Sequence, residues 1–180
     1  MKLTITALGI PANRVGFHVL DQAQIHGSCT VCHQAQLSGE AQLVGGVRML
    51  DRSRVYGKAR VRYGVTLRNE AQVYDYATVK GDQVEISGHA KVFDLAWVTE
   101  EALIGENAQI YGRSEIKGLA VVVGDAQVSG FAKVGGQAWV GGKAKLRGKV
   151  RVGGTARIVG GTWTKGEILE GSWKAPGKRA

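Results

Sequence analysis

Aliphatic residues recur at every sixth position along most of this chain. The series starts at Val19, ends at Ile158 and fills 24 successive positions, with one slip of a single residue between Val79 and Ile86. The residue two places before each aliphatic one is mostly Ala. In a β-strand, residues two apart point to the same side, so the Ala and the aliphatic residue both point inward and the residue between them points outward. The spacings of three and four that a helix needs are absent. The pattern predicts many short strands, and taking Val84 as the inward partner of Ile86 widens one corner by a residue.

Two residues after the aliphatic position, the sequence favours a sharp corner. Gly124, Asp94 and Asn69 are examples, and these residue types tolerate the backbone conformation that a corner requires. A strand with its corner is too short for a hairpin, but three of them can close a triangular turn that stacks in parallel on the next. We therefore expect an all-β fold, a single-stranded parallel β-helix (β-solenoid) of about eight triangular coils, roughly 38 Å long at about 4.8 Å per strand.

The six-residue units at 122–127 and 104–109 are examples of the repeat. They resemble the repeats of the hexapeptide-repeat superfamily, whose fold is a left-handed parallel β-helix, and the similarity runs from residue 19 to about 162. It implies left-handed coils and a habit of trimerising. In that family a glycine usually follows the aliphatic residue directly, as at Gly105 and Gly141, whereas here it mostly falls one place later. The chain thus resembles a divergent branch.

The two flanks depart from the six-residue rule and are predicted to be caps, because an open solenoid end exposes apolar residues and unpaired strand edges. We expect an N-terminal cap over residues 1–18, the repeat domain over 19–162, and a C-terminal cap with a basic tail over 163–180. In the last segment the glycine period changes to five. Trp163 and Trp173 are predicted to form a lid over the last coil.

The composition bounds the class of protein. A chain of 180 residues with a formal charge of +9 suits one basic domain, which favours an acidic protein, a nucleotide or nucleic acid as partner. We expect no membrane association, because no apolar stretch of 18 residues exists and Met1 to Pro11 does not resemble a signal peptide. Cys29 and Cys32 fit a reducing compartment, so the expected location is the cytoplasm.

Stacking the hexads by threes aligns four aromatic residues on consecutive coils of one face. They are Tyr56, Tyr74, Phe93 and Tyr111. The same face is predicted to hold Tyr76, Leu95, Phe131 and Trp97, with Lys58, Arg60 and Arg113 at its margins. An exposed apolar patch usually marks an interface, so a homo-oligomer contact (dimer or trimer) or a partner platform is favoured. Stacking that only stiffens the sheet, or stacking of nucleobases, are the alternatives.

Basic residues gather in two stretches of the sequence. One runs from Arg48 to Arg68, and the other contains Lys143, Lys145, Arg147, Lys149 and Arg151. Because alternate residues point to different faces, neither stretch is expected to line a single groove. Both a solvated surface and a site for phosphate or nucleic acid stay open.

His89 is the sharpest catalytic candidate. Stacking by threes places it one coil from Glu70, which could orient it, and one coil from Asn107, which could bind a substrate hydroxyl, an arrangement that suits a general base. Hexapeptide acyltransferases use a coil histidine in this way with acetyl-CoA or another acyl-CoA, so the resemblance implies that chemistry as an alternative. Against it, the chain lacks the extruded loop and the helical acceptor domain that are frequent in those enzymes. An ordinary surface histidine is the other reading.

Residues 29–33 match the C-x-x-C-H haem-attachment string. The repeat contradicts that function, because Cys29 occupies the inward position that Ala holds elsewhere. A metal bound by His26, Cys32 and His33 matches no strong zinc spacing, so we expect no metal and no cofactor.

The preferred hypothesis is a non-catalytic β-solenoid that binds partners through its aromatic face and the neighbouring basic residues. One alternative is a CoA-dependent acyltransferase with His89 as general base. The other is a sequestering or inhibitory module for an anionic ligand, either a nucleotide or a nucleic-acid complex.

Overall fold

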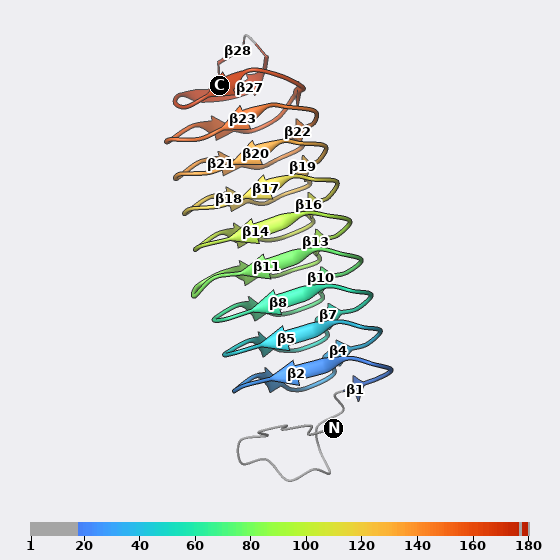
Figure 1. Cartoon of the computed structure of the whole chain (residues 1–180). Coiled ribbons are helices and arrows are strands. Elements are labelled where there is room, and N and C mark those ends of the chain that lie inside the picture. The colour runs from blue at the N-terminus through green and yellow to red at the C-terminus, as the bar shows by residue number, and fades with distance from the viewer. Residues whose placement is uncertain (1–17, 177, 180) are drawn as a thin grey trace.

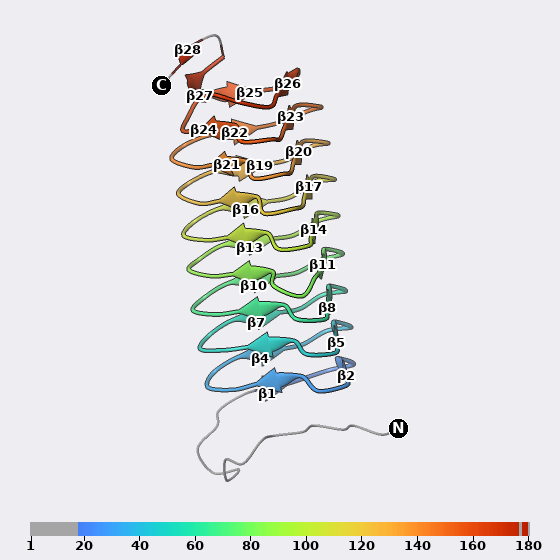
Figure 2. The ribbon, with the colours of Figure 1, turned by 90° about the vertical axis from the view of Figure 1, so that its left-hand side faces the viewer.

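The computed structural model describes residues 18–176 and 178–179, which form a β-solenoid of about nine turns (Figure 1). Each turn contributes one short strand to each of three sheets, here named A, B and C, and the described residues contain no helix. A quarter turn of the view shows the same stack of coils, one above the other (Figure 2). The predicted all-β solenoid with triangular coils is confirmed; the left-handedness implied by the family resemblance stays a prediction.

The strands of each sheet follow one another at intervals of one coil. Sheet A consists of β1 (His18–Val19), β4 (Gln36–Leu37), β7 (Arg54–Val55), β10 (Gln72–Val73), β13 (Lys91–Val92), β16 (Gln109–Ile110), β19 (Gln127–Val128), β22 (Lys145–Leu146) and β25 (Thr162–Trp163). Sheet B consists of β2 (Gln24–His26), β5 (Gln42–Val44), β8 (Arg60–Arg62), β11 (Thr78–Lys80), β14 (Trp97–Thr99), β17 (Glu115–Ile116), β20 (Lys133–Val134), β23 (Arg151–Val152) and β26 (Glu167–Ile168).

Sheet C contains ten strands. They are β3 (Thr30–Val31), β6 (Arg48–Met49), β9 (Thr66–Leu67), β12 (Glu85–Ile86), β15 (Leu103–Ile104), β18 (Val121–Val122), β21 (Trp139–Val140), β24 (Arg157–Ile158), β27 (Ser172–Ala175) and β28 (Lys178–Arg179). All pairings within the three sheets are parallel except that of β27 with β28, which is antiparallel. The parallel register aligns each outward side chain with its counterpart in the next coil, which lies 18 or 19 residues on through most of the solenoid and 15 to 17 residues on at the last coil.

The interior is the aliphatic series itself. Leu37, Ile104 and Ile158 are fully buried, and so are the alanines two places before most aliphatic positions. Cys29 occupies such an inward place and is 6% exposed, as predicted. Val84 is 1% exposed and faces inward beside Ile86, so the widened corner is also confirmed.

The corners have the predicted backbone. Asp94, Asn69 and Gly124 all adopt positive φ, of 57°, 60° and 71°. The acidic and amide residues do more than tolerate this conformation, because their side chains accept a hydrogen bond from the backbone N–H of the corner residue in the next coil. Asp94 Oδ2 accepts from the N–H of Gly112 at 3.0 Å, and Asp51 Oδ2 accepts from that of Asn69 at 2.9 Å. Asp or Asn can therefore replace Gly at a corner and also link two coils.

The C-terminal segment extends the solenoid before it ends it. β25, β26 and β27 pair in parallel with the coil below, although they are spaced by five residues, and Trp163 takes the inward aliphatic place with 6% exposure. Trp173 contacts the Trp163 ring edge-on at 6.2 Å between ring centroids, and β28 then folds back on β27. The predicted cap at 163–180 thus includes a ninth coil, while almost all of the predicted cap at 1–18 lies outside the described residues.

Candidate functional site

Four aromatic rings form a continuous stack on sheet A. Tyr56, Tyr74, Phe93 and Tyr111, here called the aromatic ladder, follow the inward aliphatic residue on four consecutive coils. Their ring centroids are 4.8, 4.9 and 5.0 Å apart and their planes are within 5° of parallel. The spacing follows from the separation of hydrogen-bonded strands, so the sheet itself sets the stacking distance.

Because the rings cover one another, the aromatic ladder is half-buried. Burial raises the pKa of Tyr74 to about 12, and burial also raises the pKa of Tyr56. The Tyr56 hydroxyl donates a hydrogen bond to Gln72 Oε1 at 3.2 Å. Only the ring edges and the outer faces of Tyr56 and Tyr111 remain for a partner, which leaves little ring surface for nucleobase stacking.

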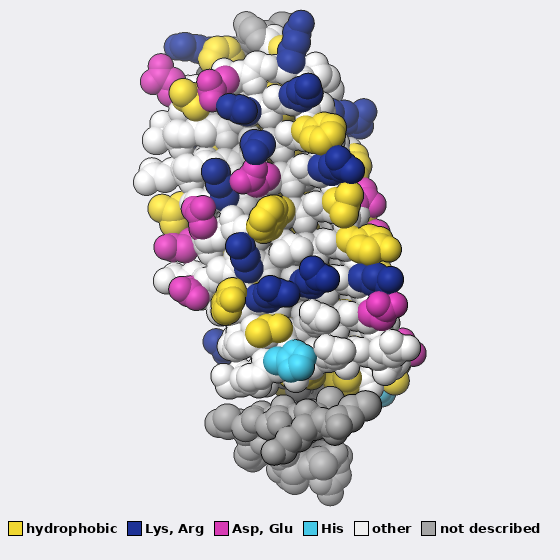
Figure 3. Space-filling model, viewed as in Figure 1, with side chains coloured by type: hydrophobic (Ala, Val, Ile, Leu, Met, Phe, Trp, Pro, Cys, Tyr) yellow, Lys and Arg dark blue, Asp and Glu magenta, His cyan; other side chains and the backbone are white. Residues whose placement is uncertain are grey.

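A second row of side chains follows the turn between sheets A and B. Lys58, Tyr76, Leu95, Arg113 and Phe131, here called the edge row, occupy the same corner position on consecutive coils. Tyr76, Leu95 and Phe131 are 59%, 51% and 53% exposed. Figure 3 shows apolar and basic side chains alternating along this edge, on the right of the view.

Within the edge row the cations lie close to the aromatic rings. Lys58 Nζ is 5.8 Å from the centroid of the Tyr76 ring, and the Arg113 guanidinium is 5.9 Å from that of Phe131. Tyr76, Leu95 and Arg113 line an open hollow of about 440 Å³ together with Asp75, Asp94 and Gly112. Lys58 Nζ is 3.5 Å from Glu40 Oε1, whereas Arg113 has no ion pair within the described residues. The edge row therefore offers apolar surface together with the cation of Arg113.

Trp97 and Arg60 lie on sheet B, so the sequence-based placement of Trp97 on the face of the aromatic ladder is wrong. The outward residue just before an aliphatic one lies on the same strand as that aliphatic residue. Trp97 therefore lies on β14 with Val98, and Arg60 lies on β8 with Val61. Arg60 and Arg62 point outward from β8 and Lys80 from β11, and Figure 3 shows basic side chains gathered over these strands. Arg62 Nε is buried and has no hydrogen-bond acceptor in the described part of the chain.

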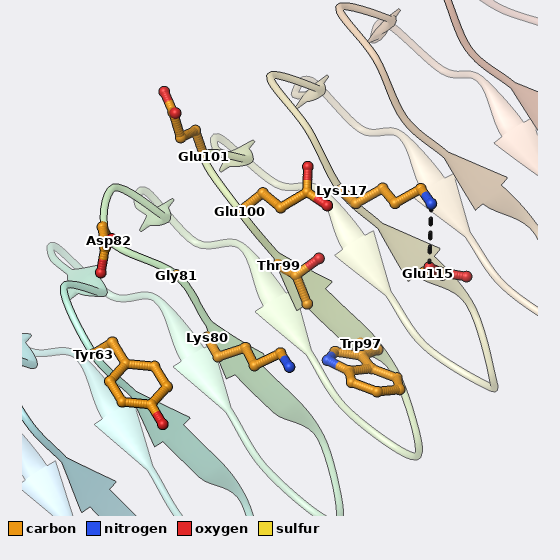
Figure 4. A pocket seen from close by; sticks show the side chains of 10 residues that line it. All are labelled: Tyr63, Lys80, Gly81, Asp82, Trp97, Thr99, Glu100, Glu101, Glu115 and Lys117. Carbon is orange, nitrogen blue, oxygen red and sulfur yellow. Dashed lines mark ion pairs between the residues drawn. The ribbon is translucent and has the colours of Figure 1, made fainter.

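An open groove of about 700 Å³ lies where sheet B meets the widened corner (Figure 4). Its lining residues are Tyr63, Lys80, Gly81, Asp82, Trp97, Thr99, Glu100, Glu101, Glu115 and Lys117. Lys80 Nζ is 5.2 Å from the Trp97 ring centroid, and Glu115 contacts both Lys133 and Lys117, at 2.6 and 3.9 Å. The hydrogen bond from Lys133 lowers the pKa of Glu115.

Sequence reasoning missed this groove, and the only sequence signal near it is the register slip, which widens the corner after β11. In the structure, Tyr63 holds a positive φ of 66°, which is unusual for a bulky residue. At Gly81, with φ of 143°, a side chain would collide with the carbonyl oxygen of Glu100. The lining contains no histidine or cysteine, so the groove offers aromatic and charged contacts to a polar ligand but no imidazole or thiol chemistry.

The structure places His89 beside Glu70 as expected, with 3.2 Å between His89 Nδ1 and Glu70 Oε2. Asn107, however, donates to Asp125 Oδ1 at 3.0 Å, so the expected amide beside the imidazole has another partner. The His89 side chain is 66% exposed on the turn between sheets C and A. Neither the groove nor the hollow is lined by these residues.

The two cysteines are free thiols. Burial raises the pKa of both thiols, which favours their protonated form. Cys32 Sγ is 3.7 Å from His33 Nδ1. No group of three or more potential ligands for a metal ion occurs among residues 18–176 and 178–179.

The C-terminal basic residues form a belt around one coil. Lys145 lies on β22 of sheet A, Lys149 on the following turn and Arg151 on β23 of sheet B, with Arg147 between them; Lys143 precedes them on the turn before β22. They point to different faces, as the alternation predicted. None of the five has an ion-pair partner within the described ranges.

No family model, no curated protein and no solved structure matches this chain. In the described part of the chain there is also no helix of the length and apolarity needed to cross a bilayer. The geometry of the surface therefore carries the functional proposal.

Proposed function

We propose that this chain is a non-enzymatic binding solenoid that captures an acidic polypeptide along the edge row. The observation that carries the proposal is the exposure of Tyr76, Leu95 and Phe131 in line with Lys58 and Arg113. A continuous row of this kind suits an extended partner segment, because the row runs along the solenoid axis with one side chain per coil.

The neighbouring strands supply positive charge that the chain itself does not neutralise. Arg60 and Arg62 on β8 have no ion-pair partner in the described residues, and the buried Arg62 Nε lacks an acceptor. A carboxylate of the partner would pair with the exposed Arg60 side chain through a charge-assisted hydrogen bond. Charge and exposed apolar surface thus lie side by side at the edge row.

An acidic polypeptide is favoured over nucleic acid by the arrangement of the rings. Base stacking needs free ring faces, but those of Tyr74 and Phe93 are covered on both sides by their neighbours. Tyr76 and Phe131 already have a cation near their rings. Apolar side chains of a peptide can instead pack between the exposed residues of the edge row, for example in the hollow beside Leu95.

The test compares a fluorescent peptide of alternating Glu and Phe with oligo-dT, by anisotropy at several salt concentrations. We expect the peptide to bind more tightly, and Tyr76→Ser with Phe131→Ser to weaken its binding about tenfold or more. The matched control is Leu169→Ser, which removes an equally exposed apolar side chain, 53% accessible, from the last coil. Equal loss in the control, or stronger binding of oligo-dT, would contradict the proposal.

A CoA-dependent acyltransferase is the second candidate, because Glu70 contacts His89 as a base-orienting carboxylate would. The imidazole stands on a convex turn and is largely exposed, so substrate would meet it without exclusion of water. Acetyl-CoA should therefore give no thermal shift. A clear shift that His89→Ala abolishes would favour the enzyme over the binding solenoid.

A further inference from the structure

Three consecutive strands of sheet C present no charged side chain to solvent. β15, β18 and β21 direct outward Leu103, Val121 and Trp139, and the next outward positions are Gly105, Val123 and Gly141. Leu119, on the turn that leads into β18, is 50% exposed. We call this surface the apolar face.

The apolar face is flat. The Trp139 ring lies over Gly141 so closely that a Cβ at this glycine would overlap it, and Gly105 lies between Leu103 and Val123. No aromatic stack covers these side chains as it does on sheet A. Flat apolar sheet faces pack on one another at about 10 Å.

Opposite charges bound the apolar face along the solenoid axis. The outward column of sheet C reads Glu85, Leu103, Val121, Trp139 and Arg157 on five consecutive strands. Glu85 is held by an ion pair with Arg68, and the Arg157 guanidinium lies 4.3 Å from the centroid of the Trp139 ring. The column is therefore self-complementary about its centre, Val121.

We propose that the apolar face is the interface of a homodimer in which two solenoids pack face to face with antiparallel axes. A two-fold axis that passes Val121 and runs along the strands places Glu85 of each copy opposite Arg157 of the other. It also places Leu103 opposite Trp139 and brings the two copies of Leu119 together. This interface is on a different sheet from the edge row, so it is independent of the proposed binding function.

A second copy fits this face better than another occupant, because it pairs Glu85 and Arg157 at the two ends of the face with opposite charges. It also brings no unpaired charge to the centre of the face. The register also brings Arg68 opposite Lys174, but at the ends of the face, where solvent screens them. With Val121 on the axis, the two copies of sheet C overlap from β9 to β27, which is six steps of about 4.8 Å. A width of roughly 13 Å then gives about 370 Å² per copy, or about 750 Å² in total, the size of a weak, transient contact. We therefore expect a reversible dimer.

Sedimentation velocity over a range of protein concentration tests the proposal. We expect the full chain to dimerise reversibly and Val121→Arg to raise the dimer dissociation constant about 100-fold or more, because it buries two cations at the axis. Gln127→Arg, which introduces the same residue at the equivalent outward place of β19 on sheet A, is the matched control and should leave the mass unchanged. A wild-type chain that stays monomeric at several hundred micromolar overturns the proposal.

A charge swap tests the register. Glu85→Arg and Arg157→Glu should each raise the dimer dissociation constant about tenfold. The double variant should bring the dissociation constant back to within about threefold of the wild-type value. The two residues are roughly 19 Å apart in one chain, too far to contact, so only a second copy can produce the rescue. A double variant no better than the single ones, with melting temperatures that show all three folded, overturns the antiparallel register.

Discussion

The aromatic ladder on sheet A and the apolar face on sheet C both place apolar side chains on the outside of the solenoid, but only one of them covers its own surface. On sheet A, four rings at consecutive positions stack within 5.0 Å of one another. On sheet C, aliphatic residues alternate with glycines and leave Leu103 36% exposed. Outward apolar residues can thus serve either folding or association.

The difference arises from the shape of the side chains. Planar rings repeat along a parallel sheet at the strand spacing and make full contact with the next coil. Valine, leucine and a tryptophan that lies along its own strand meet their neighbours only partly. We infer that the aromatic ladder stabilises the monomer, whereas the apolar face contributes little until a second copy covers it.

Removing a ring from the middle of the aromatic ladder should have the largest effect on the monomer. Phe93→Ala breaks two stacked contacts and leaves a gap between Tyr74 and Tyr111, so we expect a loss of about 2 kcal/mol in the free energy of unfolding, less than for a fully buried Phe. Urea denaturation of dilute protein measures it.

Leu103→Ala is the companion variant on the apolar face. At the same low concentration it should change the free energy of unfolding by less than about 0.5 kcal/mol. It should, however, weaken the dimer at high concentration. If the two variants destabilise dilute protein equally, the two surfaces do not differ in the way we infer.

Extending the aromatic ladder should have a smaller effect of opposite sign. Ser38 occupies the ladder position one coil below Tyr56, whose outer face is free. Ser38→Tyr adds one stacked pair and should raise the free energy of unfolding by about 1 kcal/mol. Ser87→Tyr, which adds a ring to sheet C without an aromatic neighbour in the next coil, is the control and should raise it less.

Much of the fold could be predicted because a strict repeat converts sequence spacing into position. The inward place of Cys29, the corner at Asp94, the stacking order of the aromatic ladder and the contact of His89 with Glu70 all follow from counting in threes. Each is a property of register, which the pattern of aliphatic residues fixes.

Features that depend on the actual paths of side chains could not be predicted in this way. Trp97 was assigned by hexad and not by strand, so it was placed one sheet away from its true position. Asn107 could have turned toward His89, but Asp125 offered a stronger acceptor in the next coil. The groove needed the three-dimensional shape of the widened corner, which a one-residue slip does not specify.

The smallest expected effect concerns the titration of the aromatic ladder at high pH. Burial holds the pKa of Tyr74 near 12, above the ordinary value of 10.0, so the folded chain keeps this proton more tightly than the unfolded chain does. The stability that this group contributes is complete below the ordinary value and is lost as pH rises toward about 12. Absorbance titration of the phenolates should show late transitions from Tyr56 and Tyr74, and Tyr74→Phe should remove the one near pH 12, whereas Tyr76→Phe on the exposed edge row should leave both in place. A transition near pH 12 that survives Tyr74→Phe would mean that stacking does not shield this phenol, and the contrast between the covered ladder and the uncovered face would weaken accordingly.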